Sequence, residues 1–586
     1  IHLKEVLNSN NNFSHLFWSS VIFFRVLLSS AAIHSILKYL AENASSLACE
    51  SSYRSMIKFR TFSRTMVFLS ESWKVNGLAI LIVSLTLLYF FLKRTYSYWE
   101  RNGFKTLPNY NYILGHFKET LAQKEFVGDF IARLYNSTSE PFVGIYSILR
   151  PILLVRDPEL IRLILIKDFS HFTDRDVHCN EEYDPLSGVL FSLPGKRWKN
   201  IRTKLTPAFS SGKLKAMFGT LHDCGSTMQN YLEKYADNDK VLEVRDLAAR
   251  YTTNVIASVG FGLDIDSIGD PNNDFRVYGA QVFEPSISNA IRWFFFFIAP
   301  KIMSVLRIHV VNSKVDHFAR SITRQNLEYR EKNNIVRKDF FQLLIQIRNA
   351  GTVQLDDDDW SVESNQKKTL SENEIAAIAF NFFAAGFETS STTLSFCLYE
   401  LSKHPEIQQR VHNEIDRVLK EHDGKITFES ISDMKYLGRC FDETLRMYPT
   451  LPIINRTCTK EYRIPGTNKV IEKGTPVYIP VIALQMDDKY YDEPKIFNPD
   501  RFNEENTVGK NIVNRPYLSF GDGPRNCIAA RLGKIQTKVG LVMMLQKFRF
   551  ELPDQYKNDE IKFSPKTFLI APFDGINLHV FKRNAF

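Results

Sequence analysis

The feature that most constrains this chain is one long helical pattern that begins after Ser371 and ends near Lys403. Ser371 and Glu374 have the spacing of a capping box, and Pro405 stands just beyond the last helical position. At a rise of about 1.5 Å per residue, the segment 372–403 would be roughly 48 Å long. A helix of that length crosses a whole domain, so the sequence predicts a large, mainly helical fold built around it.

The middle of this helix departs from a good helix-forming sequence. The letters AAGFETSSTT place Gly386, Glu388 and Thr389 between apolar neighbours. Glycine destabilises a helix, and serine and threonine compete for its backbone hydrogen bonds. Such local violations concentrate at functional sites. The alternative is a solvent-exposed kink, which the apolar surroundings disfavour, so we expect a functional site here.

A second apolar segment lies near the N-terminus. Residues 75–92 are uncharged, and Lys93 and Arg94 follow at once. This length is near the lower limit for crossing a bilayer, and the basic residues place the rest of the chain in the cytosol. The alternative is a buried core helix, which usually carries polar residues on one face. We therefore expect an unassigned extension at 1–65 (upstream translated sequence or a gene-model artefact), a membrane anchor at 66–98 and a catalytic domain at 99–586.

Composition excludes several classes of function. The net charge is +9, with the lysines and arginines dispersed, which does not indicate a nucleic-acid-binding protein. The 7 cysteines are odd in number and form no CxxC pair. Neither a disulfide framework nor a zinc site is therefore indicated.

One cysteine lies in the unusual segment FGDGPRNCIAARLG, residues 520–533. Gly521 and Gly523 indicate a turn, and the apolar stripe after Cys527 indicates a helix. A helix N-terminus stabilises a thiolate, and Arg525 adds positive charge. The residues alone leave three roles open for Cys527: a nucleophile, a redox sensor or an axial haem ligand.

A third motif, FDETLRMYP at 441–449, has helical spacing and places Glu443 three residues before Arg446. Residues three apart on a helix face each other. Such pairs are common on helix surfaces, so this one is informative only together with the other motifs.

Five motifs, in order, resemble those of the cytochrome P-450 family. FGDGPRNCIA is similar to the haem-binding loop FxxGxRxCxG, AGFETS to the oxygen-activating helix motif, and ETLR to the ExxR pair. PDRF at 499–502 resembles PxRF, and RWKNIR at 197–202 resembles WxxxR. The resemblance runs from about Trp99 to the C-terminus and is to the microsomal type, as in insect enzymes of the detoxification clan. It implies a mainly α single-domain fold with small β-sheets, and haem b between the oxygen-activating helix and the cysteine-loop helix.

The resemblance implies a role for each matched residue. Cys527 would be the axial thiolate ligand of the haem iron, and Thr389 with Glu388 would relay protons beside Gly386 during oxygen activation. Further contacts to the haem would come from Trp198, Arg202, Arg456, Phe520 and Arg525. A structural triad would be formed by Glu443, Arg446 and Arg501.

Two positions depart from the family pattern. Ala529 stands where the family usually has glycine, and we expect a modest adjustment of the loop without loss of haem. Gln485 replaces a histidine often found in related sequences, and we expect no consequence for catalysis.

The resemblance also implies an activity. It is that of a monooxygenase that inserts one atom of dioxygen into an apolar small molecule, a xenobiotic or an endogenous lipid or hormone, with NADPH electrons. The alternatives are a haem-thiolate isomerase or dehydratase and a non-catalytic haem-binding protein. The intact pair of Glu388 and Thr389 favours the monooxygenase. Phe383 and Phe387, which flank the motif, are the candidate substrate-pocket residues.

The expected location is the endoplasmic reticulum membrane, with a single-pass anchor and a cytosolic catalytic domain. The expected partners are the flavoprotein NADPH-cytochrome reductase, cytochrome b5 and membrane lipid, with no nucleic acid. The basic segment GKRWKNIRTK at 195–204 suits docking of an acidic reductase, and the alternative is a solvated face. RWFFFFIAP at 292–300 resembles the apolar lid region of the family.

Overall fold

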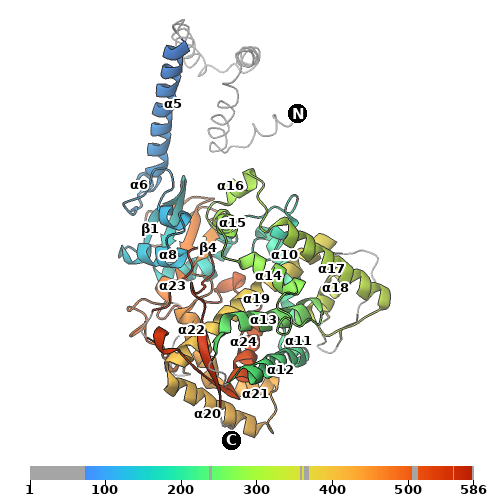
Figure 1. Ribbon diagram of the computed structural model, residues 1–586. Coiled ribbons are helices and arrows are strands. Elements are labelled where there is room, and N and C mark those ends of the chain that lie inside the picture. Colours follow the sequence, from blue (N-terminus) through green and yellow to red (C-terminus); the bar gives the residue numbers. More distant parts are fainter. Residues whose placement is uncertain are drawn as a thin grey trace. The chain divides into compact units, whose positions relative to one another are not determined.

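The computed structural model describes residues 73–236, 240–354, 356, 359–361, 369–503, 513–557 and 560–583 (Figure 1). The predicted extension at 1–65 and the first part of the predicted anchor, 66–72, lie outside the described residues. The chain divides into two units, residues 1–90 and 91–586, and each is described by itself.

Helix α5 (Trp73–Tyr96) contains the predicted membrane segment. Within the described part of the chain it is the one helix, Asn76–Tyr96, that is long and apolar enough to cross a membrane. Apolar side chains along it are exposed, with Leu81 at 53% and Phe90 at 60%. A core helix would bury such side chains, so α5 is compatible with the predicted anchor.

Unit 91–586 is mainly helical. The helices that precede the long central one are α6 (Tyr98–Arg101), α7 (Lys118–Leu121), α8 (Val127–Asn136), α9 (Pro158–Arg162), α10 (Gly195–Leu205), α11 (Ser211–Ala216), α12 (Phe218–Tyr235), α13 (Val244–Ile256), α14 (Asp274–Phe283), α15 (Ile287–Phe297), α16 (Pro300–Val305), α17 (Ser313–Asn333) and α18 (Phe340–Ala350). The central helix and those after it are α19 (Glu372–Lys403), α20 (Pro405–Glu421), α21 (Phe428–Asp433), α22 (Lys435–Met447), α23 (Val481–Leu484) and α24 (Ala530–Leu545).

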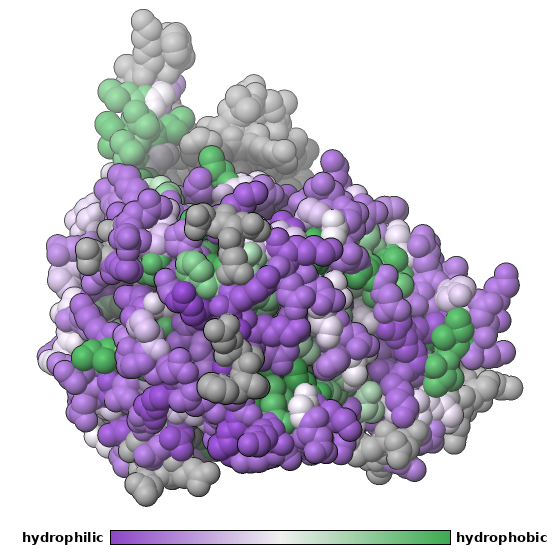
Figure 2. Space-filling view, turned by 60° about the horizontal axis from the view of Figure 1, so that its bottom comes forward, coloured by the Kyte–Doolittle hydropathy of each residue, from purple (hydrophilic) through white to green (hydrophobic). Residues whose placement is uncertain are grey.

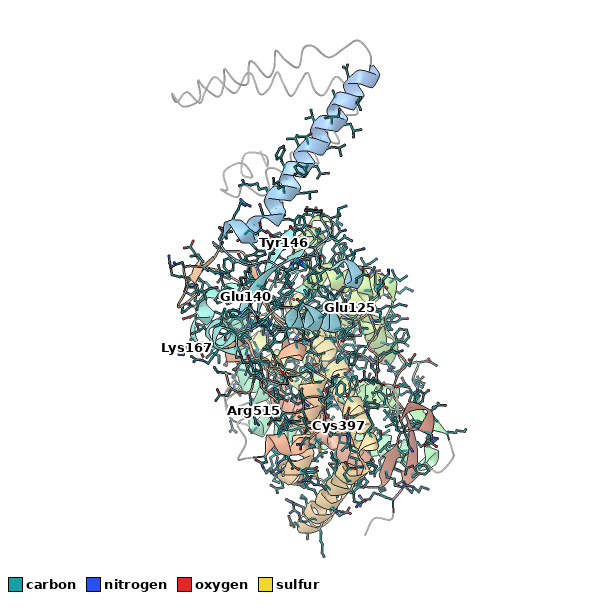
Figure 3. All side chains as sticks on the ribbon, turned by 90° about the vertical axis from the view of Figure 1, so that its left-hand side faces the viewer. Glu125, Glu140, Tyr146, Lys167, Cys397 and Arg515 are labelled. Carbon is teal, nitrogen blue, oxygen red and sulfur yellow. The ribbon has the colours of Figure 1, made fainter. Side chains whose placement is uncertain are left out.

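Helix α19 has the predicted bounds, and its start follows from local chemistry. The Ser371 side chain accepts from the backbone N–H of Glu374, whose carboxylate in turn accepts from the Ser371 N–H. This reciprocal pair is the predicted capping box. Helices α13 and α24 pack along α19, which runs through the middle of the unit (Figure 1). Figure 3 shows Cys397, in the C-terminal half of α19, among densely packed side chains.

Three small sheets complete the described part of the unit. The largest has the order β1-β2-β7-β4, with strands β1 (Phe142–Ser147), β2 (Arg150–Val155), β7 (Pro476–Ile479) and β4 (Ile454–Thr457). Its β1 and β2 form an antiparallel hairpin in which Phe142 lies opposite Val155. The other sheets are β3-β9-β8 (Val241–Glu243, Asn577–Lys582, Phe548–Glu551) and β5-β6 (Tyr462–Arg463, Val470–Ile471). The helices and the three small sheets agree with the predicted fold class.

The outer surface of this unit is mostly polar. Figure 2 shows a face that is largely hydrophilic, with small and separate hydrophobic patches. The apolar side chains instead fill the interior along α19, where Leu394, Phe396 and Leu398 are fully buried. The burial of these chains is the main favourable contribution to the stability of the fold.

Candidate active site

The cysteine loop is a tight turn that leads into α24. Gly521 and Gly523 have φ angles of 70° and 68°, which favour glycine. A Cβ atom at Gly523 would also collide with the carbonyl oxygen of Leu165. The backbone N–H of Cys527 donates to the carbonyl of Phe520 at 2.8 Å and closes the turn. The two glycines therefore place Cys527 just before the first turn of α24.

The Cys527 side chain is exposed to solvent, but many protein atoms, including cationic side chains, surround its thiol. These atoms desolvate the thiol and raise its pKa, although a backbone hydrogen bond from Ala529 and the charges of Arg202 and Arg175 act to lower it. The helix terminus and nearby cations therefore do not by themselves produce a thiolate, because desolvation outweighs them. A cationic metal would reverse this balance, since a coordinating thiol loses its proton.

Arginines from four separate segments gather beside this loop: Arg175, Arg202 on α10, Arg456 on β4 and Arg525. Burial and mutual repulsion lower the pKa of Arg525 to about 9, and burial lowers that of Arg175 to about 10. The Nε atoms of Arg175, Arg456 and Arg525 are buried and make no hydrogen bond to any described residue. Arg525 also lies over the ring of Trp198, 4.4 Å from its centroid.

This arginine cluster fits a bound dianion. None of the four arginines forms an ion pair with an Asp or Glu among the residues that the structure describes. Arg456 and Arg525 are buried, and Arg175 and Arg202 are half-buried. Buried cations need anionic partners, and the two propionates of the predicted haem would supply them. The adjacent Cys527 thiol would supply the iron ligand. The residues present therefore fit the predicted cofactor.

Arg175 was not among the predicted haem contacts. It lies in the loop after α9, where no motif or periodic pattern marks it. Its Nη2 donates to the carbonyl of Arg525 at 3.1 Å, and its guanidinium lies over the ring of Phe191 at 3.9 Å. Arg202, in contrast, donates to the carbonyl of Asn526 at 2.8 Å and to its side chain at 2.9 Å. Arg202 thus also braces the cysteine loop.

The predicted oxygen-activating segment presents an accessible face in the middle of α19. Ala385 is exposed, and Gly386 and Thr389 are half-buried, although the helix is buried on either side. The Thr389 hydroxyl donates to the carbonyl of Ala385 at 2.6 Å. A Cβ atom at Gly386 would lie 2.5 Å from Cδ1 of Ile256, so this glycine allows α13 to pack closely. The accessible face is therefore built from Ala385 and Thr389.

The Glu388 side chain points toward α13 and not toward Thr389. Its buried carboxylate forms an ion pair with Arg245 in the first turn of α13. The Glu388 charge raises the pKa of Arg245. Glu388 and Thr389 are adjacent in sequence, but their side chains make no hydrogen bond to each other. Arg245 was not among the predicted site residues, because nothing in its sequence surroundings marks it.

The three residues of the predicted structural triad come together. Arg446 Nε donates to Glu443 at 2.7 Å, and both side chains are 0% exposed. Arg446 Nη2 donates to the other Glu443 oxygen at 2.8 Å, and Arg501 Nε lies 3.3 Å from that same oxygen. Arg446 also donates to the carbonyls of Gln485 and Pro494, both at 2.8 Å. The triad therefore ties α22 to the segment before PDRF.

Gln485 has a structural position that the sequence did not reveal. Its amide nitrogen donates to the carbonyls of Leu445 and Arg446, and its amide oxygen accepts from the backbone N–H of Leu518 at 2.7 Å. Gln485 thus joins the C-terminal end of α22 to the start of the cysteine loop. At Ala529 the φ angle is −98°, which any residue adopts, so the backbone there does not require glycine.

The remaining predicted residues lie as follows. Phe520 stacks near Phe441, with ring centroids 6.3 Å apart. Phe383 is buried against Gly279 and Phe275 of α14. Phe387 contacts Phe283 of α14 and lies below Arg276. Both rings therefore face α14, away from the exposed Ala385, and their role in a substrate pocket stays a prediction.

The basic helix α10 lies beside the cysteine loop, because Arg202 contacts Asn526. Arg197 is paired with Glu181 and Glu374. Lys196 and Lys199 are exposed and form no ion pair with any described residue. A positive surface is therefore available close to Cys527.

Comparison with known proteins identifies a matching family. The family model described as Cytochrome P450 matches residues 106–574. The chain is 40% identical to "Probable cytochrome P450 6d5" of Drosophila melanogaster over 85% of this chain and 98% of that protein. It is 38% identical to "Cytochrome P450 6d3" of Musca domestica over 86% and 99%, and 36% identical to "Cytochrome P450 6k1" of Blattella germanica over 89% and 99%.

Proposed function

Because the chain belongs to the cytochrome P450 family and is a haem-thiolate monooxygenase, we propose that it oxidises an apolar small molecule with electrons from NADPH. In the overall reaction, dioxygen, two electrons and two protons convert a C–H bond of the substrate into C–OH and release one water. The observation that carries this proposal is the cluster of arginines that gathers beside Cys527.

When bound, haem supplies the activation of dioxygen, which the thiolate favours by donating electron density. The chain's own residues bind and orient it. Arg175, Arg456 and Arg525 would neutralise its carboxylates in a buried setting, where charged hydrogen bonds are strong. The Thr389 hydroxyl donates its proton to the Ala385 carbonyl. The hydroxyl oxygen of Thr389 can therefore accept a hydrogen bond from a proton-carrying water.

The proposed redox partner is a flavoprotein reductase, with cytochrome b5 as a second electron donor. The exposed Lys196 and Lys199 on α10 support docking of an acidic surface next to the thiolate. Helix α5 would hold the protein in the endoplasmic reticulum membrane, as its length and apolar character suggest. Charge reversal at Lys196 and Lys199 should slow reduction and leave haem binding unchanged.

The first test is the carbon monoxide difference spectrum of the reduced holoprotein in membranes, beside Cys527→Ser. We expect a strongly red-shifted Soret band in the wild type that is absent from the variant. An ordinary haem-like band from folded, haem-loaded wild type would contradict the proposal. Reductase-dependent NADPH consumption with product formation then tests the electron source and separates oxidation from isomerisation.

A further inference from the structure

Two histidines and a buried aspartate join two segments of unit 91–586 that are distant in sequence. The first segment is the loop 176–184, which carries His178 and Asp184. The second is the connection 306–312 between α16 and α17, which carries His309. The side chains of His178 and Asp184 are 0% and 1% exposed, whereas that of His309 is 50% exposed. None of the three has a role in the proposed reaction.

The carboxylate of Asp184 lacks a full set of partners. Its Oδ2 atom accepts from the backbone N–H of Val310 at 2.9 Å and lies 3.5 Å from Nε2 of His178. Its Oδ1 atom is buried and makes no hydrogen bond to any described residue. No lysine or arginine in the described part of the chain forms an ion pair with it. A buried carboxylate is costly without a cationic partner, so Oδ1 is open to one.

The buried imidazole of His178 is already fully hydrogen-bonded in its neutral form. Its Nδ1 lies 3.0 Å from the hydroxyl of Ser304, which itself donates to the carbonyl of Pro300 at 3.2 Å. This arrangement assigns the ring proton to Nδ1, so that Nε2 accepts from the hydroxyl of Tyr183 at 3.2 Å. A second proton on the ring, at Nε2, would displace the Tyr183 hydroxyl.

His309 is placed to supply the missing charge. Its Nδ1 lies 3.6 Å from Oδ1 of Asp184, the oxygen that has no hydrogen bond. An imidazole in contact with water gains its proton near neutral pH. The protonated ring attracts the carboxylate at this distance, and the neutral ring does not. The charge state of His309 therefore decides whether Asp184 has an ion-pair partner.

The other titratable or charged groups that face this pair keep their charge near neutral pH. Burial raises the pKa of Tyr183, whose ring lies 5.8 Å from that of His309. Burial also raises the pKa of Cys179, which the charge of Asp184 affects as well, to about 12. Arg307, whose charge acts on Tyr183, stays a cation. Among the described residues around Asp184, His309 is thus the one exposed group that titrates in this range.

The connection 306–312 has little regular structure of its own. Its residues belong to no described helix or strand. Arg307 has a φ angle of 51°, in the left-handed region that favours glycine. The N–H of Val310 is bonded to the side chain of Asp184 and not to a backbone carbonyl. The contact with Asp184 is therefore one of the bonds that hold this connection in place.

We propose that Asp184 and His309 form a pH-sensitive clasp, which holds the connection 306–312 against the loop 176–184 in mild acid and loosens above neutral pH. The closed clasp binds the His309 proton and the open clasp gives up its ion pair, so acid favours the closed form. The loop begins next to Arg175, and the clasp fastens its other end. This inference goes beyond the proposed function and does not rest on it.

The test is hydrogen–deuterium exchange of the full-length holoprotein in detergent at about pH 6 and about pH 8, either side of the range in which an imidazole titrates. Each rate is corrected for the intrinsic pH dependence of amide exchange. We expect the protection of 306–312 to be about 3- to 10-fold higher at the lower pH, as for an ion pair with one exposed partner. His309→Gln and Asp184→Asn should abolish this difference. His309→Lys, which keeps a positive charge at both pH values, should keep the higher protection at both.

A matched control is His222→Gln on α12. His222 Nδ1 lies 3.3 Å from Oδ1 of Asp223, but these side chains are 40% and 84% exposed, so solvent screens the pair. This variant should leave the pH effect at 306–312 as in the wild type.

Two results would overturn the clasp. One is a wild-type protection of 306–312 that agrees at the two pH values within about 1.5-fold. The other is a pH effect that persists in His309→Gln, because another group would then titrate. Circular dichroism at both pH values confirms that each variant is folded, and the wild-type comparison decides the question if a variant is not. Exchange needs no turnover, so the result is independent of the monooxygenase activity.

Discussion

Replacement of Glu443 by Gln should be among the most damaging single changes in this protein. The substitution keeps the shape of the side chain but removes the charge that faces Arg446 and Arg501. Glu443 and Arg446 are both 0% exposed, so water cannot replace the lost partner. Removal of one member of a buried ion pair costs about 3–5 kcal/mol, a large fraction of a typical total stability.

A matched control is available on the surface of α20. Arg417 and Glu421 form an ion pair at 2.8 Å, but their side chains are 59% and 55% exposed. Glu421→Gln makes the same chemical change as Glu443→Gln, and an exposed pair contributes roughly 0.3–0.5 kcal/mol. The buried and exposed variants should therefore differ by about tenfold in free-energy cost.

The assay is thermal unfolding of the full chain in detergent, followed by circular dichroism. At roughly 2 °C per kcal/mol for a large domain, Glu443→Gln should lower the midpoint by about 6–10 °C, and Glu421→Gln by about 1 °C. Thermal unfolding midpoints that agree within about 1 °C for the two variants would refute the reasoning, because burial of the ion pair would then not determine the loss of stability.

Three further changes have outcomes set by the structure. Arg245→Gln leaves the buried Glu388 carboxylate without its partner and should lower the free energy of unfolding by about 2–4 kcal/mol at pH 7, which urea titrations measure. Burial lowers the pKa of His412 from 6.5 to about 4, so the free energy of unfolding has its full value above pH 6.5 and falls as the pH drops to 4. The loss should reach about 3 kcal/mol in urea titrations at several pH values, and it should be absent from His412→Gln. Ala529→Gly should cost less than about 1 kcal/mol and keep the red-shifted Soret band, since φ at this position is ordinary; loss of the band would show that the methyl group matters.

Features that depend on short-range chemistry could be predicted from the sequence. The bounds of α19 follow from the capping box at Ser371 and the proline after Lys403, and both act within a few residues. Glu443 and Arg446 are three apart on one helix, so their contact follows from helix geometry.

Features that depend on contacts between distant segments could not be predicted. Arg175 joins the arginine cluster from a loop, and Arg245 reaches Glu388 from α13; neither has a periodic pattern or motif. The direction of a side chain on α19 depends on which helix packs against it. Phe387 therefore turned out to face α14, although its sequence position beside the oxygen-activating motif indicated the site.

The amide of Gln485 connects α22 to the cysteine loop by hydrogen bonds that do not depend on pH. Its donor and acceptor ends are chemically fixed, so the same three hydrogen bonds persist across the physiological range. An imidazole in this place would lose its acceptor on gaining a proton near neutrality. The loop that carries Cys527 is thus held by a side chain that does not titrate, and these hydrogen bonds remain when the surroundings become acidic.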